Sequence, residues 1–254
     1  MTNFDYNGIL TCASYAFPPN SLHYCGPEKQ NNLLAYQREQ IADAGLAEIV
    51  RDFQTLYPYL TLIAHENNIA DPFDPRVVEA YWIGNGLLKN VKINNFYHHL
   101  HDSLGLKKRV KPKDLELLYG KLPIGLLPHH TFHVLNIFTR TGHHTTKHTL
   151  ETMDACRISW GQVKNCELRI TTPTTLYVET RPLILQNGKL ALGKHVTKQI
   201  HVQSFQSQNT TYHIPNTKFV SFHWDTFCDI LTDQQAKRLE YYTEHALQLA
   251  NTTL

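Results

Sequence analysis

The chain has 254 residues, of which 42% are hydrophobic and 18% are charged, as is typical of a globular protein with a sizeable core. Its net charge of +2 excludes an electrostatic case for binding nucleic acid or an anionic membrane. No stretch approaches 18 uninterrupted apolar residues, and the N-terminus lacks a signal-peptide pattern. Five cysteines in a chain of this size indicate reduced thiols, so we expect a cytoplasmic protein.

The first 150 residues are predicted to form helices. Apolar residues recur at three- and four-residue steps over 46–60, which builds one apolar stripe along a helix. Asp74 and Pro75 predict the N-cap and the first turn of another helix. Gly84 and Gly86 are expected within that helix, where glycine costs stability and indicates close backbone approach by a neighbour. Two weaker helices are expected at 93–104 and 112–122.

The pattern changes after about residue 152 to short alternating or β-branched segments separated by turn residues, which predicts strands. Asn187-Gly188 is the clearest hairpin turn among them. Thr232 opens a capping box, Thr-Asp-Gln-Gln, that begins a helix with one apolar side. The expected strands cover 157–163, 168–172, 176–185, 200–205 and 218–223.

These patterns predict an α+β protein with two domains. The first, 1–150, is expected to be all-helical. The second, 151–254, is expected to be a small antiparallel β-barrel whose closing strand, 218–223, leads directly into the C-terminal helix.

Two residues of the second domain are candidate metal ligands. Cys156 lies just ahead of an expected strand, where a partly exposed thiolate would be accessible, and His223 ends the closing strand. If the strands are neighbours, a sulfur and a nitrogen ligand meet at one rim of the barrel, a pairing that suits iron or zinc. The alternative is that Cys156 is a small core residue and His223 a hydrogen-bonded strand histidine.

The barrel segment resembles the hydrogenase formation chaperone family (HypC/HupF). Chains of that family begin with a Cys-x-x-x-x-Gly-x-Val motif, which Cys156, Gly161 and Val163 match. They later carry a valine-rich strand with a histidine, which Val220 and His223 match, and then a short link into an acidic helix. The match continues, in order and spacing, through Leu231, Asp233 and Ala236. The whole chain also resembles uncharacterised proteins encoded beside hydrogenase genes in some bacteria.

The resemblance implies a role in hydrogenase maturation. In the family, the cysteine and histidine are associated with holding the iron that carries cyanide and carbonyl ligands. The chaperone moves this iron between a scaffold protein and the hydrogenase large subunit. The resemblance therefore implies that Cys156 and His223 bind the iron, and that the chain is an accessory maturation factor for a nickel–iron hydrogenase. The chain departs from the family pattern because Cys156 is internal and Asp225 replaces a glycine that follows the histidine.

A second candidate metal site lies in the helical domain. Pro128 is expected at the first helical position, so that His129 and His133 lie four apart on one helix face. Two histidines at that spacing can chelate a metal ion, with Glu79 or Cys25 as a possible further ligand. Cys25 is also expected just before a helix that begins near Pro27, whose positive end favours a thiolate. The alternative is a pair of hydrogen-bonded histidines in a polar helix start.

This second site supports a different function, a metal-dependent enzyme. In that case the helical domain prepares a small precursor at His129 and His133, and the barrel serves only as a docking module. A third option is a barrel that binds single-stranded nucleic acid by stacking on aromatic side chains. The near-neutral net charge argues against it, and we expect no nucleic-acid or membrane partner.

Overall fold

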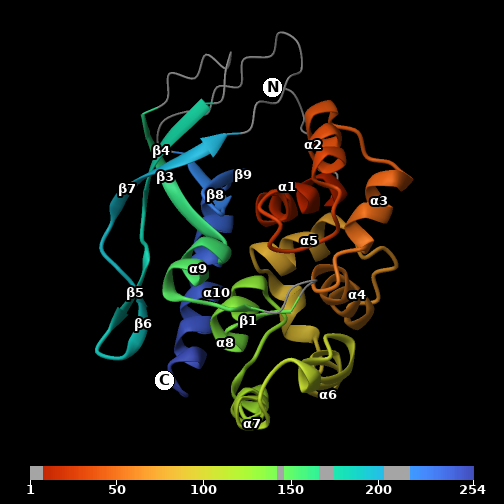
Figure 1. Ribbon diagram of the computed structural model, residues 1–254, viewed down its shortest axis with the longest axis vertical. Coiled ribbons are helices and arrows are strands. Elements are labelled where there is room, and N and C mark those ends of the chain that lie inside the picture. The colour runs from red at the N-terminus through yellow and green to blue at the C-terminus, as the bar shows by residue number, and fades with distance from the viewer. Residues whose placement is uncertain (1–7, 142–145, 166–173, 203–217) are drawn as a thin grey trace.

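The protein has a mixed α+β fold, as predicted. The computed structural model describes residues 8–141, 146–165, 174–202 and 218–254. Helices from the first part of the chain lie beside a small sheet structure formed by the last part, and the C-terminal helix runs between them (Figure 1). None of the helices in the described ranges is both long and apolar enough to cross a bilayer.

The helical part contains a series of short helices around one core. Asp74 caps one of them as predicted, because its side chain accepts a hydrogen bond from the backbone N–H of Arg76 and Pro75 occupies the first turn. The helices are α1 (Gly8–Ser21), α2 (Gln30–Glu39), α3 (Ala44–Arg51), α4 (Leu56–Glu66), α5 (Pro75–Trp82), α6 (Ile93–His98), α7 (Pro112–Tyr119) and α8 (His130–Ile137). Shorter 3-10 or π segments are η1 (Gly86–Asn90), η2 (His99–Ser103), η3 (Leu106–Lys108) and η4 (Leu122–Ile124).

The prediction that residues 1–150 are all-helical is wrong at their C-terminal end. There β1 (Thr139–Arg140) pairs with β2 (Thr146–Lys147) in a small antiparallel sheet. Phe138 has a positive φ of 55°, which ends α8 and turns the chain into β1.

The second part forms a closed barrel in the strand order β3-β4-β7-β9-β8. One pairing differs from the predicted antiparallel barrel, because β7 lies parallel to β9. The barrel strands are β3 (Ser159–Asn165), β4 (Thr174–Thr180), β7 (Val196–Val202), β8 (Phe219–His223) and β9 (Thr226–Leu231). The predicted strand at 168–172 and the end of the one at 200–205 lie outside the described residues.

The predicted hairpin at Asn187-Gly188 is confirmed. These two residues join β5 (Leu183–Gln186) to β6 (Lys189–Leu192), and both have the positive φ that a tight hairpin turn needs, at 53° and 75°. This hairpin lies outside the closed barrel. Its glycine therefore shapes an appendage of the barrel and not the barrel itself.

The sequence had indicated that strand β8 leads directly into the C-terminal helix, but the structure shows another strand between them. Trp224 and Asp225 have positive φ values of 49° and 57° and turn the chain back into β9. Helix α10 (Asp233–Ala250) begins only after β9, with the predicted capping box between Thr232 and Gln235. The barrel thus gains a strand that the sequence analysis did not predict.

The two parts of the chain share buried surface. Helix α10 packs against α8 and also contacts β6 and β9. A single core cluster includes residues of α1, α5 and α8 together with residues of α10, while the barrel interior holds a smaller apolar cluster. The predicted boundary at 150/151 falls at the start of α9 (Leu150–Cys156), whose first turn is capped by Thr149. The division into two domains stays a prediction.

Gly84 lies beyond the end of α5, and α10 explains why it is glycine. Its φ is +95°, and an added Cβ would lie 1.9 Å from Cδ2 of Tyr242 in α10. Gly86 lies two residues further on, and an added Cβ there would meet no atom within 4 Å. The predicted close approach is therefore real at Gly84, although a side chain makes it, and is not found at Gly86.

We predict that Gly84→Ala lowers the free energy of unfolding by about 2–4 kcal/mol, through left-handed backbone strain and the clash with Tyr242. The matched control Gly86→Ala should change it by less than about 0.5 kcal/mol. Urea unfolding followed by circular dichroism measures both. Equal effects of the two substitutions would contradict the packing of α10 on this loop.

Candidate metal centre

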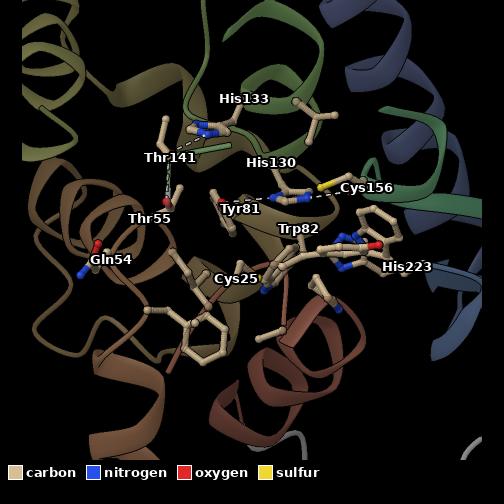
Figure 2. A pocket seen from close by; sticks show the side chains of 18 of the residues that line it. Cys25, Gln54, Thr55, Tyr81, Trp82, His130, His133, Thr141, Cys156 and His223 are labelled. Atoms are coloured by element: carbon tan, nitrogen blue, oxygen red, sulfur yellow. Dashed lines mark hydrogen bonds between the residues drawn. The ribbon is translucent and has the colours of Figure 1, made fainter. Parts of the chain in front are cut away.

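A pocket opens where the helical part meets the barrel. It contains about 650 Å³ of empty space, part of it open to solvent. Three of its lining side chains, His130, Cys156 and His223, each offer one potential metal-ligand atom, and these atoms all lie within 4.8 Å of one another. Figure 2 shows these side chains converging from different elements beside Trp82.

Cys156 and His223, the two residues singled out by the sequence, therefore come together. Cys156 is the last residue of α9, and His223 is the last residue of β8. The backbone N–H of Trp224 donates to the carbonyl oxygen of Ala155 at 2.8 Å, which holds the end of the strand against the end of the helix.

The expected surroundings of Cys156 are wrong, however. It ends a helix and does not lie at the mouth of a strand, and it is 9% exposed. His223 is 1% exposed. The two side chains thus meet in a buried pocket where the barrel joins the helices, and not on an open barrel rim.

His223 has the hydrogen bonding expected of a metal-binding histidine. Its Nδ1 lies 2.7 Å from the carbonyl oxygen of Tyr15, which can only accept, so Nδ1 carries the proton and Nε2 carries the lone pair. Nε2 is buried and makes no hydrogen bond to any described residue. Burial lowers the pKa of His223 to about 4, against the opposing effect of the hydrogen bond to the Tyr15 carbonyl. The ring is therefore neutral at pH 7, with an unused ligand atom.

His130 is the third member of the cluster, and sequence reasoning missed it. Its Nε2 lies 2.8 Å from the carbonyl oxygen of Cys156, and its Nδ1 lies 3.2 Å from the hydroxyl of Tyr81. Nε2 is thus the nitrogen on the Cys156 side. Because a carbonyl oxygen can only accept, Nε2 donates to it and carries the proton in this structure. Metal binding through Nε2 would require this bond to break and the proton to move to Nδ1, which can then donate to the Tyr81 oxygen. Burial, and then the nearby His223, lower the pKa of His130 well below its ordinary value.

His129 and His133 do not share a helix face. The helix begins at His130, two residues later than the Pro128 pattern predicted, and His129 is its N-cap with extended backbone. The His129 ring stacks on Tyr242 at a centroid distance of 5.4 Å. His133 lies along the pocket, where its ring nitrogens are 2.9 Å from the Tyr59 hydroxyl and 3.1 Å from that of Thr141.

Cys25 lines the same pocket from the loop between α1 and α2. The following helix begins at Gln30, so the predicted start near Pro27 is wrong and Cys25 does not lie at the helix end. Cys25 is half-buried and is not part of the three-residue cluster found in the described residues.

The donor set determines what this centre can do. One thiolate sulfur and two neutral imidazole nitrogens suit borderline or soft transition metals such as zinc, iron(II) or copper. Three protein ligands leave a fourth position in a tetrahedral site, as in centres where the metal exchanges ligands or acts on them. The cluster of His130, Cys156 and His223 can therefore hold a metal ion.

The comparisons with known proteins place the chain in a family. Residues 4–254 match the model of DUF6390, a family of unknown function, and the chain belongs to this family. No curated protein and no solved structure matches the chain.

The buried histidines predict a steep loss of stability in mild acid. Burial lowers the pKa of each, so protons bind the unfolded chain more tightly than the folded one, and stability falls as the pH drops below about 6.5. Each contributes about 1 kcal/mol of unfolding free energy per pH unit in this range. These residues are His99, His129, His130, His133 and His223.

Urea unfolding between pH 7 and pH 5 measures this loss. His99→Phe should reduce the slope of stability against pH by about one proton, because it removes one ring whose folded pKa is about 3. A stability that stays constant from pH 7 to pH 5 would contradict the neutral buried histidines.

Proposed function

We propose that this protein is an accessory maturation factor for a nickel–iron hydrogenase, which transiently binds an iron group at Cys156, His223 and His130. The observation that carries the proposal is the convergence of Cys156 and His223. They come from helix α9 and strand β8, yet their ligand atoms lie within 4.8 Å of each other and of one from His130. These are the two residues to which the chaperone resemblance assigns the iron.

The other residues of the resemblance have physical reasons for their identity. An added Cβ at Gly161 in β3 would lie 2.7 Å from the carbonyl oxygen of Glu179 in β4, so only glycine permits this strand contact. Val163 and Val220 are buried in the apolar interior of the barrel. Asp225, where the family has glycine, adopts the left-handed backbone that glycine favours, with φ at 57°. The matched motif therefore contains residues that the barrel fold needs as well as the two proposed ligands, Cys156 and His223.

Delivery of iron requires contact with a protein partner, for which we propose the hydrogenase large subunit or a maturation scaffold protein. A groove of about 1400 Å³, partly open solvent, lies between the barrel and α10. Arg181 and Lys237 line it together with Asp233 and Glu240, so it offers charges of both signs. Such a surface suits a polar, specific and transient contact.

The alternative, a metal-dependent enzyme built on His129 and His133, has less support. His129 stacks on Tyr242 outside the helix, and His133 contacts two hydroxyl groups from inside the pocket. The two histidines thus face different surroundings. Metal binding that depends on His129 would restore this alternative.

We predict that the full-length protein binds one Fe²⁺, Co²⁺ or Zn²⁺ per chain after anaerobic reconstitution. Cys156→Ala, His223→Ala and His130→Ala should each weaken binding by more than about tenfold, because each removes a ligand. His129→Ala and His65→Ala are the controls and should keep the affinity. Elemental analysis and competition with a chelating dye measure stoichiometry and affinity. Full binding by Cys156→Ala, or loss with His129→Ala, would refute this centre.

In a host that depends on this protein for an active hydrogenase, Cys156→Ala should abolish activation and the large subunit should copurify with the wild type. Cys228 is a buried thiol of β9 outside the pocket. Cys228→Ser should therefore preserve activation as the matched control. Normal hydrogenase activity with Cys156→Ala, in cells without other copies of the protein, would overturn the proposed function while leaving metal binding to be judged by the preceding test.

A further inference from the structure

The metal centre is buried, so an incoming ion must reach it through the pocket. His130, Cys156 and His223 are each less than a tenth exposed, whereas the pocket that they line is partly open to solvent. A hydrated cation would have to lose its water before it met these ligands, and desolvating an unpaired charge is costly. An unpartnered, fully buried Nε2 of His223 faces this pocket, which indicates that a ligand is expected there.

A second sulfur donor lies along the route at Cys25. Cys25 lines the same pocket but is only half-buried, unlike Cys156. Its loop is held in place on both sides. The side-chain amide of Asn20 donates to the carbonyl oxygen of Cys25 at 2.8 Å. Gly26 adopts a positive φ of 80° against the ring of Phe53, where an added Cβ would lie 2.2 Å from Cε1. The thiol is therefore presented from a fixed position.

Cys25 and Cys156 flank the same pair of aromatic residues. In Figure 2 the Trp82 side chain lies between Cys25 and the His130–Cys156 pair. The rings of Trp82 and His130 are in contact, with centroids 4.6 Å apart. Tyr81 also lines this pocket, together with both thiols. The two sulfurs thus line one pocket, with Trp82 between Cys25 and the cluster.

We propose that Cys25 is a relay thiol, which binds an incoming metal ion at the rim of the pocket and passes it by ligand exchange to Cys156, His130 and His223. The inference rests on the proposed metal binding and adds a kinetic role to it. In the transfer, water replaces the Cys25 sulfur on the ion, which then passes Trp82 and exchanges this water for the Cys156 sulfur. The proton that leaves the Cys156 thiol is balanced by one taken up at Cys25, so no oxidant or reductant is needed.

A relay has a kinetic signature that a ligand of the final site lacks. Because Cys25 takes part only in the transition between free and bound metal, its loss must slow loading and release by the same factor and leave the affinity unchanged. Loss of a final ligand would instead weaken the affinity. This difference separates the two roles without a structure of the loaded protein.

The test uses full-length protein and Co²⁺, whose bond to the Cys156 sulfur gives a charge-transfer absorption. Cys25→Ser should bind one Co²⁺ with unchanged affinity, while stopped-flow loading and removal by excess chelator both slow by about tenfold or more. Cys25→His should restore much of the rate, since imidazole also exchanges metal ligands. Cys228→Ser should match the wild type in every respect.

Two results would overturn the relay. One is that Cys25→Ser loads and releases Co²⁺ at wild-type rates. The other is that its affinity falls because release becomes faster, which would make Cys25 a ligand of the bound state. Wild-type protein that takes up no Co²⁺ would refute the metal centre itself, so the failure of the relay and the failure of the proposed function are distinguishable. Thermal unfolding of each variant confirms that it is folded.

Discussion

The hydrogen bond from Nδ1 of His223 to the carbonyl oxygen of Tyr15 joins the barrel to the first helix and prepares the metal centre. It is buried and 2.7 Å long, and it fixes both the tautomer and the orientation of the ring. A second bond of 2.7 Å, between the hydroxyls of Tyr15 and Ser221, holds the same strand against the same helix. Leaving such buried groups unpaired costs about 1–3 kcal/mol each, so the position of β8 on α1 is well determined.

This arrangement explains why the candidate site lies between the two parts of the chain. Cys156 and His223 are supplied by α9 and the barrel, but His130 comes from α8 in the helical part. Tyr15 and Tyr81, which hold the outer nitrogens of the two histidines, also come from helices of the first part. The helical part thus contributes one ligand and the groups that orient both histidines. In the proposed function, the helical part adds a third ligand to the two that α9 and β8 supply.

Much of the local structure could be predicted because it depends on short-range chemistry. The caps at Asp74 and Thr232 and the turn at Asn187 are set by their own side chains and backbone, and each was found where expected. The meeting of Cys156 with His223 was also expected, but from a resemblance to known chaperones and not from the residues alone. The burial of these two side chains was not expected, because it depends on how the helices pack against the barrel.

One miss arises because the start of a helix is hard to place to within one or two residues. Expecting α8 to begin at Pro128 put His129 and His133 on one face and left His130 between them. The actual start at His130 moves His129 out of the helix and turns His130 towards Cys156. The left-handed turn at Trp224 and Asp225 carries no glycine, so nothing in the sequence marked it as the hairpin that leads into β9.

The central claim is that one thiolate and two imidazoles hold a single metal ion. X-ray absorption spectroscopy of the Zn²⁺-loaded protein tests it most directly. We predict one sulfur at about 2.3 Å and two imidazole nitrogens at about 2.0–2.1 Å, with one further light atom in the fourth position. The sulfur should disappear from the spectrum of Cys156→Ala. A first shell of oxygen and nitrogen alone in the wild-type protein, or one with two or more sulfurs, would contradict the assignment.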